Sequence, residues 1–338
     1  MKRLLIVVVV LVVVAAGAFA FTFSDFQTAA QDFANGVSSA LPLESSVGLN
    51  WSDAYIGQLL DVPPHFGVGV TVGAATMPYS AIQGALSTFG VTLPPEASFM
   101  TSYGVPLPAY TVDVRIGGFV LPFDIGLKFG YLPPGALSSF GIGGFSADYL
   151  TIGGDIRFGL IQDRGVMPGL SVGVGYTYMR GNIGVPGMLG GPITVTAVSY
   201  GSTTHTIGFT DPSLNFLWNS SVIDAKVQLS KTLFIITPFI GLGASYGISS
   251  AGAGMQSTMT VDGSPATQSD LDQINSTYGT NYTLENPGFG VTSAASGFSA
   301  RVFGGFSFNI FILKIGVGAA YEFLSGSMAG VANARIQL

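Results

Sequence analysis

The chain has 338 residues, of which 48% are hydrophobic and only 9% charged, and its formal net charge is −6. A soluble domain carries about 25% charged residues, and a disordered chain holds far fewer apolar ones. The composition therefore excludes a disordered chain and disfavours an ordinary water-soluble domain, and an acidic chain without a basic patch argues against nucleic acid as a partner.

Residues 1–20 have the three parts of a secretory signal peptide. Lys2 and Arg3 precede an unbroken apolar run at 4–16, and Ala18-Phe19-Ala20 is a small-residue cleavage site. The alternative is a retained anchor helix. Removing Lys2 and Arg3 from the 12 basic residues leaves ten against 18 acidic ones, a net charge of −8. The chain has no cysteine, which excludes the lipoprotein route and a disulfide scaffold.

Residues 21–64 form a segment of different character. In SDFQTAAQDFANGVSSALP the apolar residues recur at helical spacing, Ser24 and Gln27 fit a capping box, and Pro42 is the expected stop. A second short helix is expected to start at Ser52. This segment either plugs the lumen of a following barrel from the periplasmic side, or lies as an amphipathic helix on the membrane or the barrel rim.

Residues 65–338 are predicted to form an all-β, antiparallel transmembrane barrel of about ten strands. Beyond residue 20 every apolar run is interrupted by charge, glycine or proline before it reaches the roughly 20 residues of a membrane-spanning helix. A closed barrel is the remaining way to span a bilayer. We expect strands at 65–74, 109–121, 123–132, 150–160, 170–178, 221–229, 234–246, 298–309, 311–323 and 331–338.

Charged residues inside these strands alternate with apolar ones. In GGDIRFGL, for example, Asp155 and Arg157 occupy one face of the strand and Ile156 and Phe158 the other. Because barrel strands send successive side chains to lipid and to lumen, the charged face is expected to line the lumen. The twelve predicted lumen-lining residues are Asp113, Arg115, Asp124, Lys128, Asp155, Arg157, Asp224, Lys226, Arg301, Lys314, Glu322 and Arg335.

The connections between the predicted strands alternate between short and long. Tight turns are expected at VLPF, QDRG, SKTL and Asn309-Ile310, and long outer loops at 76–108, 182–220 and 249–297. This alternation is typical of outer-membrane barrels, which have short periplasmic turns. The stretch 193–210 alternates less cleanly, and is either an external hairpin or two further strands that bring the count to twelve.

With its signal peptide, strands and terminal strand VANARIQL, the chain resembles bacterial outer-membrane β-barrel proteins; Leu338 stands where such proteins usually end in an aromatic residue. The resemblance implies an outer-membrane location, contact with lipid and insertion by the barrel assembly machinery. The chain is also similar to the long-chain fatty-acid transporter family in having a segment ahead of the barrel, although it is short for that family's fourteen strands. That similarity implies passage of a hydrophobic solute.

Two function classes follow. The first is passive, gated or plugged transport of a small or hydrophobic solute through a narrow lumen, and the second is a surface-structural or adhesin barrel that acts through its outer loops. The lumen charges alternatively form a network that only holds the barrel shut. Pro238 interrupts a strand and marks either a lateral opening or a bulge near the periplasmic rim. The pattern does not distinguish a monomer from an oligomer.

The inventory of reactive side chains predicts no enzyme, no cofactor and no metal site. His65, at the start of the first strand, is expected to be structural. His205 with Asp211 resembles a water-activating pair but lacks a second pair of carboxylates, so a solvated loop histidine is the simpler interpretation. Asp262, Asp270 and Asp272 do not have the spacing of a calcium loop.

Overall fold

A computed structural model of the chain describes residues 23–80, 83, 98–133, 146–186, 193–200, 202–278 and 289–338. The predicted signal peptide lies outside these residues. None of the described helices combines the length and apolar character needed to cross a membrane.

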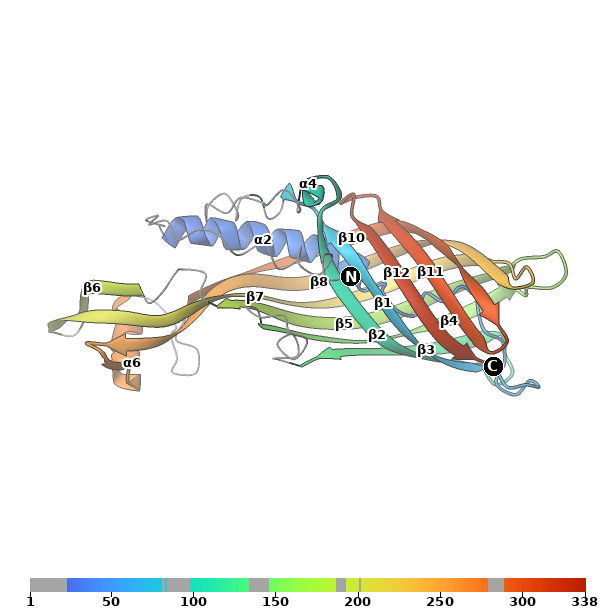
Figure 1. Cartoon of the computed structure of the whole chain (residues 1–338), viewed down its shortest axis with the longest axis horizontal. Helices are drawn as coiled ribbons and strands as arrows, with labels where there is room; N and C mark the ends of the chain where they lie inside the picture. Colours follow the sequence, from blue (N-terminus) through green and yellow to red (C-terminus); the bar gives the residue numbers. More distant parts are fainter. Residues whose placement is uncertain are drawn as a thin grey trace.

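Ten antiparallel strands close into a barrel, as predicted (Figure 1). Neighbouring strands follow the order β7-β5-β4-β3-β2-β1-β12-β11-β10-β8, and β8 pairs with β7 to close the ring. The helices are α2 (Phe23–Glu44), α4 (Phe99–Tyr103) and α6 (Gln268–Tyr278). The strands are β1 (Phe66–Met77), β2 (Val105–Gly117), β3 (Phe123–Leu132), β4 (Ser146–Ile161), β5 (Gly169–Pro186), β6 (Ile193–Tyr200), β7 (Thr203–Ser230), β8 (Ile236–Val261), β9 (Ser264–Pro265), β10 (Phe289–Ile310), β11 (Leu313–Glu322) and β12 (Met328–Gln337).

The barrel has two unlike ends. At the short-turn end the strands are joined by the turns 118–122, 162–168, 231–235 and 311–312, and β1 begins and β12 ends there. The opposite end, which we call the long-connection end, carries α2, α4, α6 and β6. Figure 1 shows the C-terminus at one end of the molecule and β6 and α6 at the other.

Several strands run further toward the long-connection end than the sequence predicts. The loops expected at 182–220 and 249–297 are wrong in part, because β5, β7, β8 and β10 continue into them and pair with one another. The hairpin expected at 193–210 is confirmed: β6 pairs with the start of β7, and the closed ring stays at ten strands. We call this projecting part of β6–β10, with α6, the extension. The extension lies beyond the barrel wall, where a strand does not have lipid on one side and the lumen on the other. Its sequence therefore has no cause to alternate between apolar and polar residues.

Within the barrel wall, apolar residues face outward and polar residues inward. On β3, Ile125, Leu127 and Phe129 are half exposed on the outer surface, while Asp124 and Lys128 are buried inside. Strand β2 ends at Gly117, four residues before the predicted end at Leu121. The reason is local: the backbone N–H of Gly118 donates to the carbonyl of Phe123 and closes a tight turn.

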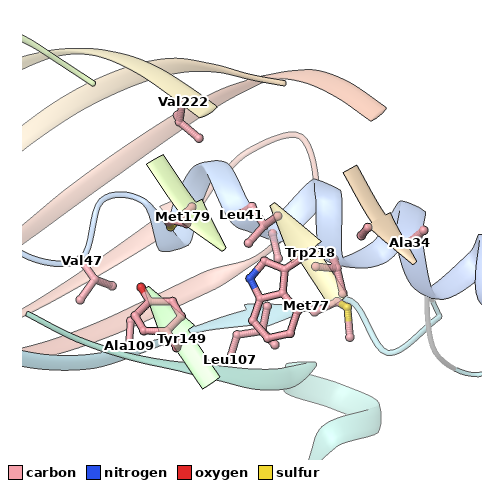
Figure 2. Close-up of a cluster of buried hydrophobic side chains, with 13 residues drawn as sticks. Ala34, Leu41, Val47, Met77, Leu107, Ala109, Tyr149, Met179, Trp218 and Val222 are labelled. Carbon is pink, nitrogen blue, oxygen red and sulfur yellow. The ribbon is translucent and has the colours of Figure 1, made fainter. Parts of the chain in front are cut away.

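Helix α2 packs against the inner wall at the long-connection end. Its apolar residues Ala34, Val37 and Leu41 join a buried cluster with wall side chains that include Met77 and Trp218 (Figure 2). The predicted stop at Pro42 is wrong by two residues, since the helix continues to Glu44. A proline removes one backbone donor, and here the helix is held by its packing on the wall instead.

Candidate functional site

Residues 45–58 run through the interior of the barrel, and we call them the lumen segment. They are irregular, so the second short helix predicted from Ser52 is wrong. The segment passes from the end of α2 to Gln58, which forms a bridge with Gly118 at the short-turn end. Gly117 is a glycine because a Cβ there would lie 2.1 Å from the carbonyl oxygen of Gly57. The lumen segment therefore packs so closely against the wall at this point that a side chain on residue 117 would clash with it.

Side chains of the wall satisfy the backbone of the lumen segment. Irregular backbone inside a membrane barrel requires such partners, because an unpaired peptide group is costly. These bonds explain why the segment forms no helix of its own. Lys128 donates to the carbonyls of Ser45 and Val47, Arg115 to Leu49 (3.0 Å), and Gln228 to Trp51, Ser52 and Asp53 (2.7, 3.1 and 3.2 Å). The amides of Ala54 and Ile56 donate to Ser230 and Asp124, both at 2.8 Å.

Five wall residues form what we call the central network: Arg115, Asp124, Asp155, Arg157 and Lys226. Asp124 forms ion pairs with both arginines, and its distance to Arg157 Nη2 is 2.7 Å. Asp155 forms ion pairs with Arg115 at 2.7 Å and with Lys226 at 2.9 Å. Their side chains are at most 5% exposed. The network contains three cations and only two carboxylates. Carbonyl oxygens of the lumen segment accept hydrogen bonds from the excess cationic donors; the carbonyl of Asp53, for example, accepts from Arg157.

Asp53 is a charged lumen residue that the sequence reasoning missed. It binds Lys314 at 2.9 Å and Arg335 at 2.7 Å, and so ties the lumen segment to β11 and β12. Trp51 lies between two arginines, 5.6 Å from Arg115 and 4.9 Å from Arg335. The available signal was numerical: the predicted wall residues comprise seven basic and five acidic side chains, an excess of two positive charges that Asp53 reduces to one.

All twelve predicted lumen residues lie on the inner face, ten of them buried and Asp224 and Lys314 partly buried. Five form the central network, and Lys314 and Arg335 bind Asp53. Arg301 pairs with Asp224 at 2.5 Å, beside Lys226 on the inner face of β7. The other three bond to neutral groups: Asp113 accepts from Thr71 and Thr111, Lys128 donates to the lumen segment, and Glu322 accepts from Ser325 and the amide of Ala300.

Pro238 lies near the short-turn end of β8, where the wall is closed in this structure. Residue 239 pairs with Ser230 of β7 on one side, and Pro238 pairs with Phe306 of β10 on the other. The carbonyl of Pro238 accepts from the backbone N–H of Lys231 at 3.1 Å. The missing donor thus falls at the rim, where the ladder with β7 ends, and the register with β10 runs through Pro238 without a bulge.

Two cavities flank the closed part of the lumen. The larger, about 640 Å³, lies at the long-connection end between α2 and strands β10 and β11, with Asp32, Ser38, Ser299 and Glu322 among its lining residues. The smaller, about 190 Å³, lies at the short-turn end around Asp53–Gln58 and His65. The central network and the first half of the lumen segment separate them.

In the extension, His205 has a different partner from the one the sequence suggested. Its Nδ1 lies 2.8 Å from a carboxylate oxygen of Asp262, its Nε2 lies 2.6 Å from the hydroxyl of Thr203, and its ring stacks on Tyr200. The side chain of Asp211 lies outside the described residues. His65 bonds through Nδ1 to the carbonyl of Gln58 at 2.8 Å. Among the described residues no cluster of three potential ligands is placed to hold a metal ion.

The Asp262 contact predicts acid sensitivity of the extension. Hydrogen bonds from the Thr206 amide and then from His205 hold the pKa of Asp262 below its usual range. Because the folded pKa is lower than the unfolded value of about 3.9, the stabilisation is complete above that value and is lost as the pH falls through the folded pKa. We expect peptides covering 203–208 to lose hydrogen-exchange protection below about pH 4. An Asp262→Asn variant should lack this step; an identical pH profile would contradict the assignment.

The closed antiparallel barrel, apolar outside and charged inside, is the fold of bacterial outer-membrane β-barrel proteins, as predicted. The chain belongs to the Lsa36-like family, whose sequence pattern matches residues 58–337. That match begins at the last residue of the lumen segment, so α2 and the rest of the segment precede it. No curated protein sequence matches the chain.

Comparison with solved structures gives a likeness of fold alone. The attachment invasion locus protein Ail of Yersinia pestis is 9% identical, with a TM-score of 0.28, over 81% of this chain and 98% of Ail. The Pseudomonas putida toluene transporter TodX is 10% identical, with a TM-score of 0.26, over 91% of this chain and 96% of TodX. A FadL homologue of Pseudomonas aeruginosa is 9% identical, with a TM-score of 0.24, over 81% and 90% of the two chains.

Proposed function

We propose that this protein is an outer-membrane surface protein: its barrel is a closed anchor, and its extension and α2 bind a partner outside the cell. The observation that carries this proposal is the lumen segment, whose carbonyls, amides and Asp53 are bonded to side chains around the wall. A lumen filled in this way serves an anchor directly, whereas a passage would require the segment to move. Outer-membrane lipid and the barrel assembly machinery are the partners that this location implies.

The orientation rests on the lengths of the connections and on outward tyrosines. Barrels in the outer membrane have short turns on the periplasmic side and long connections outside. Tyr131, Tyr246 and Tyr321 are each nearly half exposed on the outer wall, as expected for rings at the headgroup level. Strands β8 and β10 continue well past Tyr246, which supports an extension that stands in water beyond the membrane.

The course of the chain through the lumen has a consequence for the N-terminal helix. Helix α2 packs at the long-connection end, whereas β1 starts at the short-turn end, and the lumen segment joins the two through the barrel. With the long connections outside, α2 is displayed on the outer face together with the extension. The C-terminus lies at the periplasmic face.

A gated passage for a small or hydrophobic solute is the second candidate. The two cavities favour it, because they open from the two ends toward the same closed region. In that case the lumen segment is the gate, and the contacts of Asp53 hold it shut.

Labelling of single cysteines in intact cells tests the primary proposal, and the chain has no cysteine of its own. A membrane-impermeant maleimide is expected to label Ser202→Cys in the extension and Gln31→Cys on α2. It should reach Asp61→Cys, an exposed polar position at the short-turn end, only after the outer membrane is permeabilised. Labelling of Asp61→Cys alone in intact cells would reverse the orientation, and protection of Gln31→Cys would contradict the path through the lumen.

A further inference from the structure

The short-turn end carries a ring of exposed apolar side chains. All four turns and the connection 59–64 contribute, and we call the set the apolar turn ring. Turns that face water are usually rich in glycine, asparagine and aspartate, so this composition is unexpected for periplasmic turns. Its members are Leu60, Val62, Phe119, Val120, Leu121, Val166, Met167, Leu233, Phe234, Ile235, Phe311 and Ile312, each about half exposed or more.

Two members of the ring are held in an unfavourable backbone conformation. Phe234 and Phe311 each have φ of +54°, in the left-handed region, and their side chains are essentially fully exposed at 102% and 97%. Tight hairpin turns normally place glycine or asparagine at such positions, because a bulky residue is strained there. Phenylalanine at both positions costs conformational energy and gains no contact within the protein, which indicates a function outside it.

The ring is continuous with the lipid-facing wall. Phe66, Phe158 and Phe308 are exposed on the outer surface at the same end, directly beside the turns. A contiguous apolar surface of this kind marks contact with a membrane or a protein. Because the ring extends a surface that already faces acyl chains, the same bilayer is the occupant that fits it.

The turns also meet the polar requirement for entering an apolar medium. Backbone groups in lipid must be hydrogen-bonded internally. Leu233 and Ile236 exchange bonds of 2.7 and 2.9 Å, and the amide of Met167 donates to the carbonyl of Arg164 at 3.0 Å. Lys231 and Asp163 form an ion pair at the base of the turns. Asp61 and Arg164, in the same connections, are exposed, and side chains of this kind can reach the headgroups while their apolar neighbours insert.

We propose that the apolar turn ring inserts into the leaflet that surrounds the short-turn end, at the boundary of headgroups and acyl chains. The short turns are then membrane anchors that set the depth of the barrel, and the ligand of this surface is lipid. The inference does not depend on which face of the membrane the extension occupies or on what the extension binds.

Fluorescence of single cysteines tests the insertion. The full chain, refolded into phosphatidylcholine vesicles, carries an NBD label at Phe234→Cys or Phe311→Cys, with Ser202→Cys as the matched control in the extension. At both ring positions we expect blue-shifted emission, quenching by doxyl-labelled lipid and protection from iodide. The control should show the opposite. Iodide quenching without doxyl quenching at the ring positions would overturn the proposal and point to a protein partner.

A second pair of variants separates membrane contact from folding. Phe234→Asn and Phe311→Asn relieve the left-handed strain, so the thermal midpoint in detergent should stay the same or rise. Insertion of the same variants into vesicles should slow several-fold, as measured by the protease-protected fraction over time. Unchanged insertion of the double variant would contradict a role of the ring in membrane contact.

Discussion

Replacing Asp124 with asparagine is expected to destabilise the barrel by about 3–5 kcal/mol. Asp124 accepts from Arg115, from two nitrogens of Arg157 and from the Ile56 amide, and it is fully buried. Removing one partner of a buried ion pair leaves the other charge uncompensated. Here two arginines, Arg115 and Arg157, lose their carboxylate partner. Urea-dependent unfolding in detergent micelles, followed by tryptophan fluorescence, measures the loss.

Asp163→Asn is the matched control for Asp124→Asn. It removes the same charge from a partly exposed pair with Lys231 at the short-turn end. Because solvent screens such a pair, its loss should cost no more than about 1 kcal/mol. Equal effects of the two substitutions would mean that the central network does not hold the lumen segment and the wall together as the distances indicate.

Asp53→Ala is expected to turn a silent barrel into one that opens intermittently in planar lipid bilayers. The substitution removes the contacts with Lys314 and Arg335 that tie the lumen segment to β11 and β12. A loss of about 3 kcal/mol, the lower end for a broken buried pair, raises the open population roughly 100-fold. Asp61→Ala, at an exposed site on the same stretch of chain, should leave the barrel silent.

A disulfide provides the lock for the same experiment. The hydroxyl oxygens of Ser52 and Ser307 lie 2.6 Å apart inside the barrel, and the chain has no other cysteine to compete. Ser52→Cys/Ser307→Cys added to Asp53→Ala should abolish the openings when oxidised and restore them when reduced. Openings that persist in the oxidised protein would place the conducting path elsewhere. A silent Asp53→Ala barrel would mean that the other contacts of the lumen segment keep the lumen closed without the ion pairs of Asp53.

The barrel wall was predictable because each of its strands lies between two different media. The pattern FDIGLKFGYL predicts a strand at 123–132, and the structure has β3 over the same residues. The side on which Asp155 and Arg157 lie follows from the same alternation. The extension escaped prediction because its strands have no lipid on one side, so their sequences carry no matching alternation. For residues 193–210, the sequence predicted the hairpin of β6 and β7 only as one of two alternatives.

The site itself was half predictable. The twelve wall charges could be named, but their partners come from strands and segments far apart in the chain. Asp53 lies 261 residues from Lys314 and 282 from Arg335. Neither Asp53 nor Trp51 stands in a pattern that marks it as a lumen residue. Their roles appear only once the lumen segment is seen inside the barrel.

By itself, the sequence determined that this protein is a barrel, which faces of its strands meet lipid, and which charges turn inward, because burial in two media imposes a period of two residues on each strand. Only the tertiary structure decided that residues 45–58 fill the lumen, that Asp53 pairs with Lys314 and Arg335 and that apolar turns gather at one end. Those features depend on closure of the ring, which brings distant segments together by geometry and leaves no local pattern in the chain.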